Sequence, residues 1–113
     1  MRKLTEKETL LVSRMAKELP DSVGAQIIGD LTRENVENIN EDGSIIRFQI
    51  AGYARAANSD GRVIVDGVAK DQDGAHLNVI LSVDDDDRLY ELEIVRFDKG
   101  KLIGVDFETL KFY

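Results

Sequence analysis

The chain has 113 residues, of which 42% are hydrophobic, and its 15 basic and 22 acidic residues give a formal net charge of −7. The hydrophobic content is too high for a disordered protein, and the length suits one domain, so we expect a single folded domain over residues 1–113. There is no cysteine, which excludes disulfides, thiolate metal sites and cysteine nucleophiles. Lysine and arginine are not clustered, which argues against direct binding of nucleic acid.

Two amphipathic helices are predicted at the N-terminus. Thr5 and Glu8 have the spacing of a capping box, and the apolar residues behind them recur at helical intervals until Pro20. A second helix is predicted after Pro20, with Asp21 or Ser22 as its N-cap and an apolar stripe of its own. Both helices should bury one face.

The remainder of the chain alternates in the manner of β-strands. Residues 36–39 predict a short edge strand, and turn signals at 41–44, 58–61, 71–74, 84–87 and 99–100 separate the alternating segments that follow. Such short connections require antiparallel pairing, because parallel strands need long crossovers. We therefore predict an α+β fold, with two N-terminal helices packed on one face of a four- to five-stranded antiparallel meander.

Four consecutive carboxylates join two of the predicted strands. Asp84, Asp85, Asp86 and Asp87 repel one another, so folding alone gives little reason to keep them together. A partner with a cationic surface would give a reason, because acidic clusters steer such partners and complement their charge. We predict these four residues as a partner-binding site, with Tyr90 as an aromatic anchor beside them. The alternative is a solvated hairpin turn, for which aspartate is well suited.

Two further acidic turns are weaker candidates for partner contacts. One contains Asp71 and Asp73, and the other contains Glu41 and Asp42. For both turns the favoured interpretation is a solvated turn. The first also resembles the start of a calcium-binding loop, but its twelfth position is Ser82 instead of the glutamate that such a loop needs. We predict no metal site; the alternative is a weak calcium or magnesium site among Asp84 to Asp87, because hard cations favour clustered carboxylates.

Catalysis has little support in the sequence. His76 is the only histidine, and it lies within a predicted strand on the face opposite the apolar side chains. No phosphate-binding glycine loop, nucleophile elbow or paired-histidine motif is present. We therefore expect a protein that is not an enzyme and that needs no cofactor.

The sequence shows neither a signal peptide nor a membrane-spanning stretch, and the expected compartment is inferred from these two features. Residues 1–4 lead into a charged helix without the apolar segment of a signal peptide. The longest apolar stretches are far shorter than the ~20 residues that span a bilayer. We expect a cytoplasmic protein that does not contact a membrane.

Several segments together resemble a known class of bacterial proteins. The chain opens with a capped Arg-Lys-Leu-Thr helix at residues 2–5, carries an Asp-Gln-Asp-Gly turn at 71–74, and has a Leu-Tyr-Glu-Leu-Glu-Ile strand at 89–94. In these features, in size and in acidity it is similar to the immunity proteins of contact-dependent growth inhibition and other polymorphic toxin systems. That resemblance implies a role, the neutralisation of a cognate toxin, and it carries over no specific residue.

These observations favour a protein that binds a basic, nuclease-type toxin and blocks its active site or substrate surface with carboxylates. The alternative is a regulatory or protein-interaction module with another partner, and a small enzyme is a third possibility. A toxin gene beside the gene for this chain would distinguish the first from the others.

Overall fold

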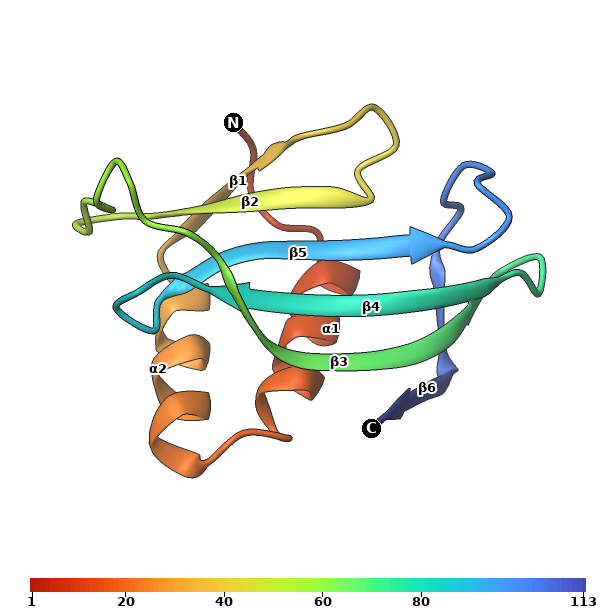
Figure 1. Cartoon of the computed structure of the whole chain (residues 1–113), viewed down its shortest axis with the longest axis horizontal. Helices are drawn as coiled ribbons and strands as arrows, with labels where there is room; N and C mark the ends of the chain where they lie inside the picture. Colours follow the sequence, from red (N-terminus) through yellow and green to blue (C-terminus); the bar gives the residue numbers. More distant parts are fainter.

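The computed structural model describes residues 1–113 as two helices and one six-stranded antiparallel sheet. The helices, α1 (Glu6–Ala16) and α2 (Asp21–Leu31), cover one face of the sheet (Figure 1). The strands in chain order are β1 (Glu34–Asn38), β2 (Ile45–Ile50), β3 (Arg62–Asp71), β4 (His76–Val83), β5 (Leu89–Arg96) and β6 (Val105–Phe112). The predicted α+β class is confirmed.

The two helices begin in different ways. At α1 the predicted capping box is present: the Glu8 amide donates to the Thr5 hydroxyl over 3.1 Å, and the Thr5 amide donates to the Glu8 carboxylate over 2.9 Å. At α2 the predicted cap is wrong, because Pro20 is the N-cap and no side chain caps the helix. The fixed φ of proline already suits the entry to a helix, and the Pro20 carbonyl accepts the first helical bond from Gly24. Each helix has 11 residues, and neither is long and apolar enough to cross a membrane.

The core lies between the helices and the inward face of the sheet. α1 contributes Leu11, Val12 and Met15, and α2 contributes Ile27. The helices approach closely at Gly24, where a Cβ atom would lie only 2.7 Å from the Ala16 carbonyl oxygen. The buried apolar residues of the strands, which alternate along β2 and β4, are Val36, Ile46, Phe48, Ile50, Val65, Ala69, Leu77, Val79, Leu81, Val83, Leu89, Leu92, Ile94, Val105 and Leu110.

The sheet has six strands, so the predicted four- to five-stranded meander is wrong in strand number and in order. The order is β1-β2-β5-β4-β3-β6. Only β3, β4 and β5 form a meander; β2 pairs with β5, with Ile46 opposite Leu92. The long β2–β3 connection, residues 51–61, makes this order possible by passing across the end of the sheet to reach β3 (Figure 1). The two outer strands are β1, which pairs with β2 at one edge of the sheet, and β6, which pairs with β3 at the other.

Candidate functional site

The four consecutive aspartates form the tight turn between β4 and β5. The Asp84 amide donates to the Arg88 carbonyl over 2.8 Å, and the Asp87 amide donates to the Asp84 carbonyl over 3.0 Å. Asp87 has a φ of 61°, in the left-handed region that aspartate tolerates better than most residues. Four aspartates in a row therefore satisfy the backbone requirements of this turn.

Asp84 is fully buried, and its carboxylate holds the turn to the rest of the fold. One carboxylate oxygen accepts the amides of Asp86 and Arg88 at 2.9 and 3.0 Å. The other accepts the Tyr53 hydroxyl at 2.6 Å and Nε of Arg55 at 3.0 Å. Burial alone would raise the pKa of Asp84, but these donated hydrogen bonds outweigh it and hold the pKa below its ordinary value. As folded, this carboxylate faces inward and is not available to a partner.

The other three aspartates of the turn are exposed and differ in their pairing. Asp87 forms an ion pair with Arg62. Asp86 lies 3.1 Å from the Tyr53 hydroxyl, and the Asp85 amide donates to the Ser59 hydroxyl over 3.3 Å. Neither Asp85 nor Asp86 has an ion pair, so two unneutralised carboxylates project from a turn whose backbone is fixed. We call Asp85, Asp86 and Asp87 the acidic turn surface.

Beneath this surface the turn is joined to α2 by a second buried ion pair. Arg88 donates to both carboxylate oxygens of Asp30, over 2.9 and 2.7 Å, in the bidentate geometry that suits guanidinium. The same guanidinium carbon lies 4.4 Å from the centre of the Tyr53 ring. Tyr53 and Arg55 come from the β2–β3 connection. The Arg55–Asp84 and Arg88–Asp30 ion pairs therefore join this connection and α2 to the β4–β5 turn.

Glu34, the first residue of β1, is buried beside this network without a hydrogen-bond partner. It is 4% exposed, and neither carboxylate oxygen has a donor. Burial, together with the negative charge of Asp30, raises the pKa of Glu34 to about 9. Glu34 is therefore protonated at neutral pH.

Tyr90 occupies a different environment from the one predicted. Two guanidinium groups stack on its ring, with the guanidinium carbons of Arg47 and Arg55 each 5.0 Å from the ring centre. It also rests on Gly61, where a Cβ atom would approach the ring to 2.6 Å. Tyr90 is half-buried and already contacts two guanidinium groups and Gly61, so it packs within this fold and does not protrude as an anchor beside the acidic turn surface.

Asp71 and Asp73 lie at the opposite end of the sheet from the β4–β5 turn (Figure 1). Asp71 is buried and accepts hydrogen bonds from the amides of Gln72, Ile103 and Gly104 and from Arg96. Burial opposes ionisation, but these donors keep the pKa of Asp71 below its ordinary value. Arg96 also pairs with Asp73 and Asp98 over 2.7 Å each. The predicted site residues therefore divide between two ends of the molecule, and Asp71 has a structural position.

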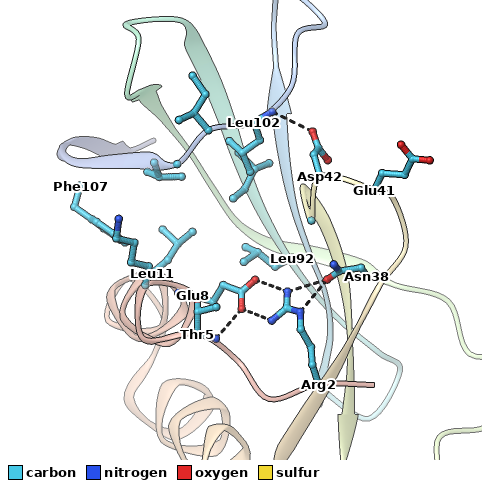
Figure 2. Close-up of a pocket in the computed structure, with 16 residues that line it drawn as sticks. Arg2, Thr5, Glu8, Leu11, Asn38, Glu41, Asp42, Leu92, Leu102 and Phe107 are labelled. Carbon is cyan, nitrogen blue, oxygen red and sulfur yellow. Dashed lines mark hydrogen bonds and ion pairs between the residues drawn. The ribbon is translucent and has the colours of Figure 1, made fainter.

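The second acidic turn, between β1 and β2, borders a pocket (Figure 2). Asp42 accepts the amides of Ser44 and Leu102, each over 3.0 Å, whereas Glu41 is exposed. The pocket has a volume of about 280 Å³ and lies between the start of α1, this turn, β5 and residues 102–107. Nothing in the sequence pattern indicated it, because its walls come from four segments that only the topology brings together.

The remaining candidates offer no chemical site. His76 is exposed at the start of β4, and its ring centre is 6.5 Å from that of Phe97. No group of three or more histidine, aspartate or glutamate side chains is arranged to hold a metal ion.

The network of Tyr53 and Arg55 was not predicted from the sequence, because residues 51–61 look like a simple connection with a turn at their end.

Comparison with known proteins adds a family and no activity. No curated protein and no solved structure matches the chain. One family model matches residues 1–106, nearly the whole chain, and its description is "Domain of unknown function (DUF6984)". The chain belongs to this family, DUF6984.

Proposed function

We propose that this domain binds a basic protein partner through the acidic turn surface, and that the partner is a cognate toxin which the domain neutralises. The observation that carries the proposal is the pairing state of the turn: Asp85 and Asp86 are exposed without cationic partners, while Asp84 beneath them fixes the backbone. A rigid display of charge loses little conformational entropy when it meets a partner.

The charge of the whole chain supports the same type of partner. The net charge is −7, and residues 51–113, which contain the turn, carry 8 basic and 13 acidic residues. Such an excess attracts a cationic surface over long range and accelerates encounter. A nuclease-type toxin has such a surface, because it must bind phosphates.

The direct test begins with the genes adjacent to the gene for this chain, among which we expect one that encodes a toxin. Its toxin domain is purified, binding is measured by calorimetry, and protection is measured by co-expression in cells. We expect Asp85→Asn combined with Asp86→Asn to weaken binding about tenfold, which is about 1.4 kcal/mol, and to reduce protection.

The matched control removes the same number of charges from other exposed positions, Glu18→Gln with Asp66→Asn. If both double variants bind equally well, the acidic turn surface is not the contact. If no neighbouring toxin exists and the domain binds some other basic protein, the immunity role is refuted and the interaction-module alternative stands.

A further inference from the structure

The pocket between α1 and the β1–β2 turn is separate from the acidic turn surface. Figure 2 shows the Arg2, Glu8 and Asn38 side chains on one side of it, Leu102 and Asp42 on another, and Leu11 and Phe107 on a third. Asp42 belongs to the β1–β2 turn and Leu102 follows β5, whereas the acidic turn surface lies between β4 and β5 at the other end of those strands. Nothing in the proposed contact of Asp85 and Asp86 uses this pocket.

The walls of the pocket are held in place without a ligand. Leu102, Ile103 and Gly104 belong to no helix or strand, yet each of their amides donates to a carboxylate. Asp42 accepts the first, and Asp71 accepts the other two. The N-terminal segment is fixed as well, because Arg2 and Val36 exchange two backbone hydrogen bonds. The cavity is therefore preformed, which lowers the entropic cost of filling it.

Arg2 limits the type of ligand that the pocket can accept. A guanidinium has five N–H donors. All five are engaged, two with Glu8, two with the Asn38 side-chain oxygen and one with the Lys3 carbonyl. Arg2 therefore has no donor left for an anionic ligand, and what it can still offer is the flat face of its guanidinium, which stacks on aromatic rings.

The other lining groups suit the same ligand. The pocket presents Leu102, Ile103 and Phe107 as apolar surface, while its other lining leucines, Leu11 and Leu92, are almost fully buried. At its edge the Asp42 carboxylate accepts only two amides, so it retains capacity for a further donor such as an indole N–H or a phenol O–H. The volume of about 280 Å³ is just below the ~300 Å³ at which pockets for drug-sized molecules begin, so it suits one large side chain.

We infer that this pocket binds one aromatic side chain, a tryptophan or tyrosine, from a basic segment of a protein partner. The ring would contact the Arg2 face and the apolar wall, and its polar atom would donate to Asp42. A basic neighbour of the aromatic residue would face the β1–β2 turn, where neither Glu41 nor Asp42 has an ion pair. These two carboxylates outnumber the one unpaired cation of the lining, Lys7, so charge complementarity favours the same kind of partner as the proposed function, on which this inference rests. Aromatic side chains in pockets are typical anchors of protein interfaces.

The test uses blocked amino acids as probes and needs no toxin. The amides of N-acetyl-tryptophan, N-acetyl-tyrosine, N-acetyl-leucine and N-acetyl-arginine are titrated into the ¹⁵N-labelled full chain, and amide chemical shifts are followed. We expect the tryptophan and tyrosine probes to give saturable shifts at residues 2–8, 38–43 and 102–105. The leucine and arginine probes should bind at least about tenfold more weakly.

Two variants separate the pocket from non-specific binding. Ile103→Ala removes an exposed wall residue and should weaken the tryptophan probe several-fold, whereas Ile28→Ala changes another exposed isoleucine, on α2, and should have no effect. Arg2→Lys keeps the charge but removes the flat face, so it should weaken the aromatic probes while a thermal melt verifies folding. The inference is overturned if no saturable shift appears at about 10 mM probe. Preference for arginine, or equal binding of leucine, overturns it too.

The outcome can be read separately from that of the proposed function. Loss of toxin binding in the Asp85 and Asp86 double variant concerns the acidic turn surface alone. If the pocket binds the aromatic probes but the toxin does not bind the domain, the pocket stands and the toxin role fails. If the toxin binds the domain but the probes do not bind the pocket, the toxin role stands and the inference about the pocket fails.

Discussion

Asp84 and Asp85 are adjacent and identical in chemistry, yet their side chains have opposite environments. Asp84 accepts four hydrogen bonds in the interior, whereas the Asp85 side chain lies in solvent. Removing charge at the two positions should therefore have different consequences. A buried carboxylate that loses its charge leaves Arg55 buried without a full partner, and an exposed one leaves nothing unpaired.

We expect Asp84→Asn to lower the free energy of unfolding by about 3 kcal/mol, the scale for breaking a buried ion pair. Asp85→Asn should change it by less than about 0.5 kcal/mol. Urea denaturation of both variants beside the parent chain measures the difference. Equal stability of the two variants would contradict the structural position assigned to Asp84.

Glu34 predicts an unusual dependence of stability on pH. Its pKa is about 9 in the folded protein and near 4.5 when unfolded, so between these values the folded state holds a proton that the unfolded state has released. Stability from this group is fully present below about pH 4.5 and is lost as pH rises towards 9. Glu34→Gln should remove this loss: between pH 6 and 8.5 the parent should lose up to about 1.4 kcal/mol per pH unit relative to the variant. Parallel unfolding curves across that range would show that Glu34 ionises normally.

At the scale of elements, charged side chains fix segments that secondary structure leaves free. Residues 98–104 lie between β5 and β6 without helix or strand. Arg96 is enclosed by Asp71, Asp73 and Asp98, and Asp71 in turn holds the amides of Ile103 and Gly104. The carboxylates that hold this segment are therefore Asp42, which accepts the Leu102 amide, and a group of aspartates gathered around the Arg96 guanidinium.

Arg96→Lys should loosen this segment, because a lysine cannot contact three carboxylates with the same fork of donors. We expect faster hydrogen exchange at the amides of Ile103 and Gly104, with a smaller change at Leu102, whose amide is held by Asp42. Arg62→Lys, at the exposed pair with Asp87, is the matched control and should leave the segment unchanged. Unaltered exchange in the Arg96 variant would contradict this account.

The sequence was most informative where structure depends on near neighbours. The capping box of α1 was predicted from Thr5 and Glu8, since its partners are three residues apart. The pairing of Ile46 with Leu92 was not predictable, because it depends on where residues 51–61 carry the chain. The acidic turn was located correctly, but the burial of Asp84 was not, because Tyr53 and Arg55 reach it from some 30 positions earlier. Local spacing contains no trace of such partners.

At the scale of the whole molecule, the net charge of −7 should govern how quickly a basic partner associates. We expect the association rate with the proposed toxin to fall steeply as salt rises, since screening shortens the range of attraction to about 8 Å at physiological ionic strength. The dissociation rate should change little. Stopped-flow association at low and high salt measures this, and rates independent of salt would argue against electrostatic steering.

The passage of residues 51–61 across the sheet also has a consequence for how the chain folds. β2 pairs with β5, more than 40 positions later, and Arg55 then donates to carbonyls of both Phe48 and Leu89. Contacts so distant in sequence form slowly, so the β3–β4–β5 meander should exist for a time with one edge of β5 uncovered. Uncovered apolar strands are prone to aggregate, and runs of charge beside them oppose this. Until Arg55 pairs with Asp84, all four aspartates of the β4–β5 turn are available to oppose aggregation of the partly folded sheet through their charge.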